Sequence, residues 1–254
     1  MRATISSDGV TPELNSFFAP AALAEELSLF DRTATGWKSY WASFVRPFVR
    51  GRVLEVGAGN GGSIRYLLGN VSDWLCLEPD PTFVAKLREE IESNALPPIC
   101  RIQAATLQDL PDDQYFDTIL YIDVMEHLAD DDREALLAAQ HLAPGGVLVI
   151  LSPAHQFLFS PFDKAVGHYR RYNRNSLSAV VPSSLEQVML IYLDSIGMLL
   201  SLGNRLVLRS AKPNEASLLF WNDWIIPLSQ RMDGVFRYAV GKSVLGAWRK
   251  PENP

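Results

Sequence analysis

The chain has 254 residues, of which 48 % are hydrophobic and 20 % charged, and this balance predicts a folded globular protein rather than a disordered one. Its formal net charge of -6 weighs against nucleic acid as a partner, because phosphates repel an acidic chain unless its basic residues cluster. Cys76 and Cys100 both lie in apolar runs, which predicts two buried free thiols and a reducing, cytoplasmic location.

No segment has the pattern of a membrane span. Residues 1–15 are polar, and no stretch reaches the roughly 18 uninterrupted apolar residues that a bilayer requires. The apolar segments 189–202 and 218–228 either form core or a dimer face, or cover an acceptor pocket; peripheral membrane contact stays open. The sequence gives no oligomeric state.

The apolar pattern predicts a loose tail over 1–18, then two helices rich in aromatic residues over 19–32 and 33–49. From residue 52 it alternates between strands and helices, which indicates a parallel sheet covered on both faces. The expected strands are 52–56, 74–77, 99–103, 116–122, 147–151, 187–193 and 242–249. The expected helices of this part are 63–68, 82–93, 131–141, 195–208 and 218–238. We expect a tail and helical lid over 1–50 and one α/β domain over 51–254, with insertions at about 153–182 and 195–240.

A glycine-rich turn follows the first predicted strand. Gly57, Gly59 and Gly61 stand where the chain passes from strand to helix, and glycine allows positive φ and close approach of a ligand. Positions 57, 59 and 62 also match G-x-G-x-x-G, which by itself equally permits a dinucleotide.

Two acids accompany the turn. Glu55 precedes Gly57 by two residues, and a pyrophosphate placed there would face an extra carboxylate, whereas a positively charged cofactor would be attracted. The alternative is that Glu55 binds a neighbouring backbone amide. Glu78 ends the second strand, 21 residues beyond Gly57, where a carboxylate can accept both hydroxyls of a ribose. Asp80 is better explained as a helix cap.

Residues 53–62, 78, 106–109 and 123–127 resemble the successive motifs of the class I S-adenosylmethionine-dependent methyltransferases. The resemblance implies an α/β fold with a Rossmann-like, mostly parallel seven-stranded sheet, helices on both faces, an antiparallel last strand and helical additions. It implies S-adenosyl-L-methionine as the cofactor. The residues that it places around the cofactor are Glu55, Gly57, Gly59, Gly61, Glu78, Thr106, Leu107 and Asp123.

Two histidines are candidate catalytic residues. His127 follows the fourth strand at the carboxyl edge of the sheet, where α/β proteins bind ligands, and His168 lies in the insertion after the fifth strand. Histidine titrates near neutrality, so either ring is a candidate general base for an oxygen acceptor. The alternative for His127 is a ring that binds a carbonyl group or shapes the pocket. No metal site is predicted.

The predicted acceptor site combines Tyr169, Arg170 and Arg171 with an aromatic lid of Trp37 and Tyr40. Arginines beside aromatic rings suit a phosphate, a carboxylate or a sugar hydroxyl, and this stretch resembles bacterial methyltransferases associated with glycolipid pathways. A small or glycolipid-like acceptor is therefore expected. The alternatives are a structural loop tied by pairs with Asp163, and helices that simply pack on the sheet.

The favoured function is methyl transfer to a small or medium-sized acceptor, with oxygen as the first guess. One alternative is an NAD(P)-dependent oxidoreductase or sugar-nucleotide enzyme, which the glycine pattern permits but Glu55 and the lack of a Tyr-x-x-x-Lys pair oppose. Another is a non-catalytic module that binds the cofactor without turnover.

Overall fold

The computed structural model describes residues 20–207 and 214–252, so the predicted tail over 1–18 lies outside the described residues. The predicted fold class is confirmed: one sheet of seven strands has the order β3-β2-β1-β4-β5-β7-β6. The first five strands run parallel, and β7 pairs antiparallel with both β5 and β6. The strands are β1 Gly51–Val56, β2 Val71–Leu77, β3 Cys100–Gln103, β4 Phe116–Ile122, β5 Leu142–Pro153, β6 Glu186–Leu193 and β7 Ser243–Arg249.

Ten α-helices are present in the described part of the chain. They are α1 Pro20–Thr33, α2 Thr35–Val45, α3 Ile64–Leu67, α4 Pro81–Glu92, α5 Asp131–Gln140, α6 Pro161–Ala165, α7 Arg174–Val180, α8 Ser195–Val207, α9 Glu215–Phe220 and α10 Ile226–Val235. A π-helical turn over Trp221–Ile225 joins α9 to α10. None of the described helices is long and apolar enough to cross a membrane.

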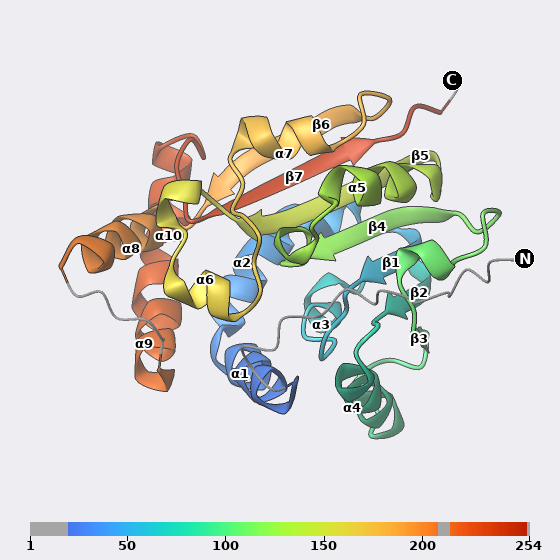
Figure 1. Ribbon diagram of the computed structural model, residues 1–254, viewed down its shortest axis with the longest axis horizontal. Helices are drawn as coiled ribbons and strands as arrows, with labels where there is room; N and C mark the ends of the chain where they lie inside the picture. The colour runs from blue at the N-terminus through green and yellow to red at the C-terminus, as the bar shows by residue number, and fades with distance from the viewer. Residues whose placement is uncertain (1–19, 208–213, 253–254) are drawn as a thin grey trace, which may run out of the picture.

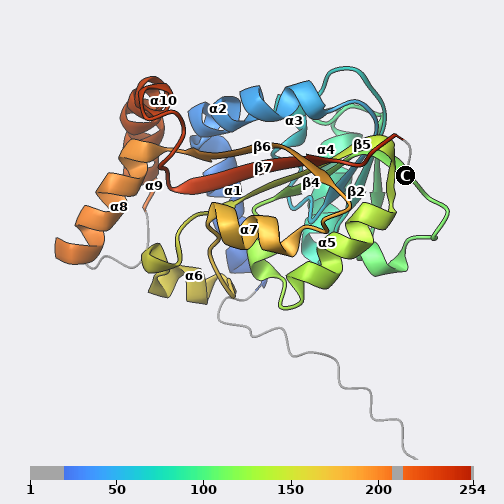
Figure 2. The same ribbon diagram turned by 90° about the horizontal axis from the view of Figure 1, so that it is seen from above.

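Alternating residues of each strand bury the two faces of the sheet, because successive side chains of a strand point in opposite directions. On β1, Val53 joins the core that lies against α2, α3 and α10, whereas Leu54 joins the core that lies against α5 and α7. Figure 2 shows these two helical layers on opposite sides of the sheet. Cys76 and Cys100 are buried and free, as the sequence predicts.

The strand β5 is longer than predicted, because it begins at Leu142 instead of 147. Leu142 pairs with Phe116, and the register shifts between Phe116 and Thr118, so the Pro144-Gly145-Gly146 stretch lies within a bulge of the strand. Figure 1 shows β4 and β5 pointing toward α6, α8 and α10. The carboxyl edge of the sheet therefore faces the two predicted insertions.

Candidate cofactor and acceptor site

The turn after β1 requires glycine. Gly57, Gly59 and Gly61 have φ of 67°, 55° and 73°, values that strain any residue with a Cβ. A Cβ on Gly57 would lie 2.8 Å from Val124 Cγ2, so the turn also packs closely on the segment that follows β4.

The N–H groups of this turn donate within the protein. Those of Gly57 and Ala58 donate to the Leu77 carbonyl at 2.8 and 3.2 Å, and that of Gly59 donates to Glu78 Oε2 at 2.9 Å. Gly61 N–H donates to the Ala58 carbonyl at 2.9 Å. A dinucleotide loop directs such groups at a pyrophosphate. This turn directs them at β2 and at itself, which weighs against the nicotinamide alternative.

Glu55 lies in β1, two residues before Gly57. It is 2 % exposed, and its carboxylate accepts hydrogen bonds from Ser63 Oγ and from Trp74 Nε1, the latter at 3.1 Å. Burial raises its pKa to about 7, and these two hydrogen bonds oppose that rise. Both oxygens are engaged by side chains, so a direct contact between Glu55 and a ligand stays a prediction.

Glu78 ends β2 and holds the turn. Its two oxygens accept the N–H groups of Gly59 at 2.9 Å and Asp80 at 3.0 Å, and burial raises its pKa. The ribose contact of Glu78 stays a prediction. Asp80 caps α4 by accepting the N–H of Thr82 at 2.7 Å, as expected of that residue.

Thr106 and Leu107 follow β3 but differ in exposure. Thr106 is exposed and forms a capping box with Asp109, whereas Leu107 is 1 % exposed and belongs to the core on the α5 side. An adenine contact would use the exposed Thr106 side of this turn, and it stays a prediction.

Asp123 and His127 lie after β4, and both side chains are solvent-exposed. Asp123 has a φ of 55°. Burial raises the pKa of Asp123 to about 6 and, together with the nearby His168, lowers that of His127 to about 4. The His127 ring is therefore neutral at neutral pH.

Glu126, between these two residues, was not singled out from the sequence. Its side chain is 0 % exposed, and Ser152 Oγ donates to Oε2 at 2.5 Å. Oε1 is buried without a hydrogen-bond partner. Burial, followed by the charge of Asp123, raises the pKa of Glu126 well above its ordinary value. No local pattern marked this residue, because its burial depends on β5 and on the loop after it.

The structure brings the two predicted catalytic histidines together. The rings of His127 and His168 meet edge to face with centroids 4.5 Å apart. His168 Nδ1 lies 2.9 Å from Asp163 Oδ1, and Nε2 lies 4.0 Å from Glu126 Oε1. The N–H of Tyr169 donates to the Glu126 carbonyl at 2.8 Å, which fixes the loop against the segment after β4.

The two predicted acceptor-binding arginines are tied to the protein. Arg171 forms a two-point pair with Asp163 at 2.7 and 3.0 Å, and its side chain is 10 % exposed. Arg170 donates to the Ala129 carbonyl at 2.8 Å and pairs with Asp131. These contacts support the alternative that the two arginines tie a structural loop to the protein. Tyr169, in contrast, is 60 % exposed and available to a ligand.

Trp37 and Tyr40 are core residues of α2. Trp37 is 4 % exposed with its ring 5.7 Å from that of Trp221, and the Tyr40 hydroxyl donates to Asp233 at 2.8 Å. Both residues thus pack in the core, as expected if α2 simply packs on the sheet. Their role as a lid stays a prediction. From α1, Asp31 reaches the glycine turn instead, through Lys38, whose Nζ donates to the Gly62 carbonyl at 3.1 Å.

The sequence of this region matches known methyltransferases. Residues 54–150 match the family described as "Methyltransferase domain". A ubiquinone biosynthesis O-methyltransferase of Mesorhizobium japonicum is 32% identical over 108 residues, which are 41% of this chain and 42% of that protein. An uncharacterized protein of Synechococcus is 30% identical over 121 residues, 46% of this chain and 27% of that protein. The chain thus matches less than half the length of either relative.

The match at residues 54–150 covers the glycine turn and the segment after β4. The predicted resemblance to class I S-adenosylmethionine-dependent methyltransferases, and the cofactor it implies, are confirmed at the level of this family. Among solved structures, the complex of the Haloferax volcanii Trm112 methyltransferase activator with a putative methyltransferase gives a TM-score of 0.62 at 17% identity, covering 92% of this chain and 96% of that chain. At that identity the likeness concerns the fold.

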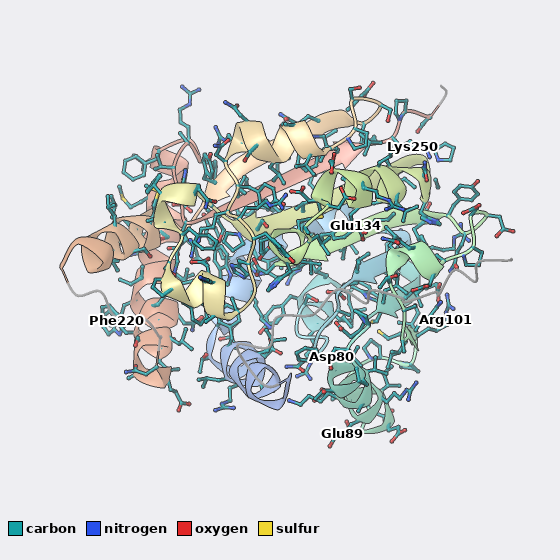
Figure 3. All side chains as sticks on the ribbon, viewed as in Figure 1. Asp80, Glu89, Arg101, Glu134, Phe220 and Lys250 are labelled. Carbon is teal, nitrogen blue, oxygen red and sulfur yellow. The ribbon has the colours of Figure 1, made fainter. Side chains whose placement is uncertain are left out.

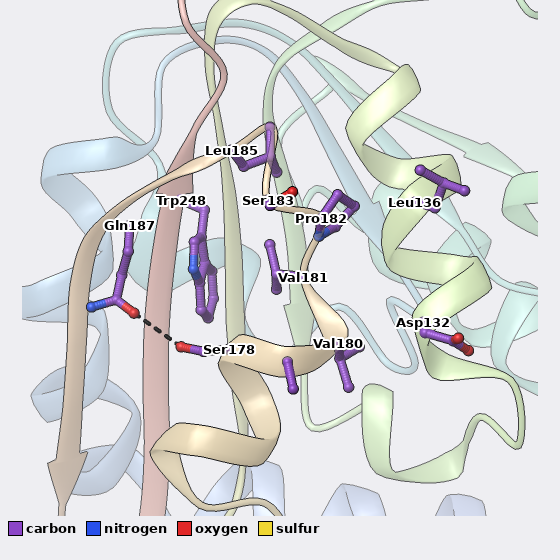
Figure 4. Close-up of a pocket in the computed structure, with 11 residues that line it drawn as sticks. Asp132, Leu136, Ser178, Val180, Val181, Pro182, Ser183, Leu185, Gln187 and Trp248 are labelled. Carbon is purple, nitrogen blue, oxygen red and sulfur yellow. Dashed lines mark hydrogen bonds between the residues drawn. The ribbon is translucent and has the colours of Figure 1, made fainter.

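Two surface recesses lie away from the cluster of acids and histidines. One, of about 640 Å³, is bounded by α5, the segment 178–187 and Trp248, and the Ser178 hydroxyl donates to Gln187 Oε1 at 3.0 Å there (Figure 4). The other, of about 390 Å³, lies on the outer side of the glycine turn between α1 and α4. We assign no ligand to either, since neither is lined by Asp123, Glu126, His127 or His168.

The apolar segment 218–228 divides between core and surface. Trp221 packs on Phe30 and Trp37, whereas Phe220 and Trp224 are 56 % and 70 % exposed. Figure 3 shows Phe220 at the outer edge of the molecule. The segment therefore serves partly as core, and nothing in the structure shows what covers its exposed side chains.

Proposed function

We propose that this protein transfers the methyl group of S-adenosyl-L-methionine to an oxygen atom of a small or medium-sized acceptor. The observation that carries the proposal is the glycine turn of the methyltransferase domain, whose N–H groups point inward while an exposed carboxylate, Asp123, stands beside it. Such a turn suits a cofactor without phosphate. The sulfonium and ammonium of S-adenosylmethionine are attracted by nearby carboxylates.

The residues at the carboxyl edge of the sheet have separate roles in holding the cofactor turn and in meeting the acceptor. Glu78 holds the turn in shape through Gly59. The bound cofactor supplies a methyl group that is already activated, so positioning of the acceptor accounts for much of the rate. An acceptor that approaches this edge meets Tyr169 and the neutral ring of His127, which has the form needed to take a proton from a hydroxyl group.

The choice of oxygen is supported by the printed name of the Mesorhizobium relative, an O-methyltransferase, and by the histidines at the site. A carbon or nitrogen acceptor needs no such base when it carries no proton to be lost at the transition state. The glycolipid-like acceptor expected from Arg170 and Arg171 is less well supported, because both guanidinium groups are engaged by protein carboxylates.

Isothermal titration of the purified protein with S-adenosylmethionine, S-adenosylhomocysteine, NAD and NADP tests the cofactor. We expect binding of the first two only, and binding of a nicotinamide dinucleotide alone would refute the proposal. Release of S-adenosylhomocysteine is then measured with phenols, catechols, carboxylic acids and amines as acceptors. Turnover of an amine but no hydroxyl compound would overturn the oxygen assignment, and tight cofactor binding without turnover would favour the non-catalytic alternative.

A further inference from the structure

We propose that Glu126, His127 and His168 together bind a divalent transition-metal cation such as Zn²⁺. Each residue offers one ligand atom, and the three atoms lie within 4.8 Å of one another. The set combines two imidazoles with one carboxylate, which is a ligand combination of three-residue zinc sites and of other first-row metal sites. The proposal goes beyond methyl transfer and departs from the sequence analysis, which predicts no metal site.

One of the three separations is close to that of a filled site. Glu126 Oε1 and His168 Nε2 are 4.0 Å apart. Two ligand atoms on a tetrahedral Zn²⁺ are separated by roughly 3.4 Å, given metal–ligand bonds of about 2.1 Å. A shift of less than about 1 Å, which side-chain rotation supplies, would bring the pair to that separation.

The unpartnered oxygen of Glu126 points to a ligand. Oε1 is the atom that faces His168, and it has no hydrogen-bond partner although the side chain is 0 % exposed. A buried polar atom without a partner is unfavourable, and such atoms are rare in native proteins. A cation between Oε1 and the two imidazole rings would satisfy it.

His168 is prepared for the role of ligand by the residues behind it. Asp163 is held as a carboxylate by its two-point pair with Arg171, so it accepts the hydrogen of His168 Nδ1 at 2.9 Å. The lone pair of the ring therefore lies on Nε2, the nitrogen that faces Glu126. A carboxylate that orients the far nitrogen of a histidine in this way is the usual partner of a metal-binding imidazole.

The surrounding backbone keeps these groups in place. The N–H of Tyr169 donates to the Glu126 carbonyl at 2.8 Å, and the N–H of His168 donates to the Asp163 carbonyl at 2.8 Å. Asp123 interacts electrostatically with both Glu126 and His168 and adds negative charge, which favours a cation. The site is thus organised without the cation, as a preformed metal site requires.

Three protein ligands leave a position for water or for an oxygen of the acceptor. A hydroxyl group bound there would lose its proton more readily, and His127 would then act as a ligand in place of a base. This consequence rests on the proposed methyl transfer, whereas the metal site does not.

Metal binding is measured on the full chain after treatment with EDTA, without S-adenosylmethionine, by calorimetric titration with ZnCl₂. We expect one Zn²⁺ per chain, a rise of the melting temperature on addition of Zn²⁺, and d–d absorption bands when Co²⁺ is used instead. Glu126→Gln and His168→Ala should each weaken binding by at least about 100-fold, and Asp163→Asn by about 10–100-fold.

The matched control is His141→Gln, which removes an imidazole outside the cluster; His141 Nδ1 contacts only the Gln114 carbonyl, at 2.8 Å, and glutamine can keep that contact. Its affinity should equal that of the wild type. Wild-type affinity no higher than that of His168→Ala, or equal losses in His141→Gln and His168→Ala, would overturn the proposal. Glu126→Gln is isosteric, so it answers the question even if His168→Ala does not fold.

Discussion

The end of β1 and the segment after β4 each contain a buried glutamate, and the two differ in their partners. Both oxygens of Glu55 accept hydrogen bonds, from Ser63 and Trp74. Glu126 accepts one, from Ser152, and its second oxygen has none. Glu55 is thus satisfied within the protein, whereas Glu126 has one oxygen left for the cation proposed above. Variants of residues in and around these two regions test this difference.

The largest expected effect is on the pH dependence of stability in Glu55→Gln. Because the pKa of Glu55 is raised to about 7 in the folded protein, the wild type loses stability as pH rises from the ordinary carboxyl range through about 7. The variant lacks this loss. Its unfolding free energy relative to the wild type should therefore rise by on the order of 3 kcal/mol between about pH 4.5 and about pH 8.

Denaturant unfolding at several pH values gives this difference. Glu89→Gln, which removes an exposed carboxylate on α4, controls for the change of net charge. If the unfolding free energies of Glu55→Gln and the wild type change with pH in parallel, burial does not raise the pKa of Glu55.

The next effect concerns the cofactor. Glu78→Ala removes the acceptor of the Gly59 and Asp80 N–H groups and the predicted ribose acceptor, so it should weaken S-adenosylmethionine binding by about 1.5–3 kcal/mol. Calorimetric titration measures the loss, with Glu89→Ala as the control. Unchanged affinity would mean that Glu78 neither shapes the turn for the cofactor nor contacts its ribose.

A pair of serine variants tests the contrast directly. Ser152→Ala removes the hydroxyl that donates to Glu126 Oε2 and should lower the unfolding free energy by about 1–3 kcal/mol. Ser63→Ala leaves Glu55 its bond from Trp74, so a loss of only about 0.5–1.5 kcal/mol is expected. Chemical denaturation of the metal-free proteins measures both, and a larger loss in Ser63→Ala would contradict the distinction between the two acids.

The smallest effect is expected from Gly57→Ala. A Cβ there meets Val124 and adopts a φ of 67°, which strains the turn by about 1–2 kcal/mol and should weaken cofactor binding about tenfold. Gly69→Ala is the matched control, because a Cβ at Gly69 has nothing within 4 Å. Equal cofactor affinities in the two variants would show that the turn tolerates a Cβ at position 57, contrary to this expectation.

The sequence determined the sheet and its cofactor turn, because these depend on local patterns. Phe116–Ile122 has the bounds predicted for the fourth strand. Gly57, Gly59 and Gly61 have the positive φ that glycine at these positions predicts. A run of apolar residues or a glycine at a turn expresses a preference of its own segment, which neighbours in the fold only reinforce.

Only the tertiary structure decided which polar groups face one another. His168 meets Glu126, 42 residues earlier in the chain, because the bridge between Ala154 and Tyr172 returns the loop to the end of β5, the strand that pairs with β4. In the same way Asp233 on α10 accepts the Tyr40 hydroxyl and helps hold it in the core, where the sequence allowed a lid. Contacts between distant segments depend on how whole elements pack, and no local pattern of residues carries that information.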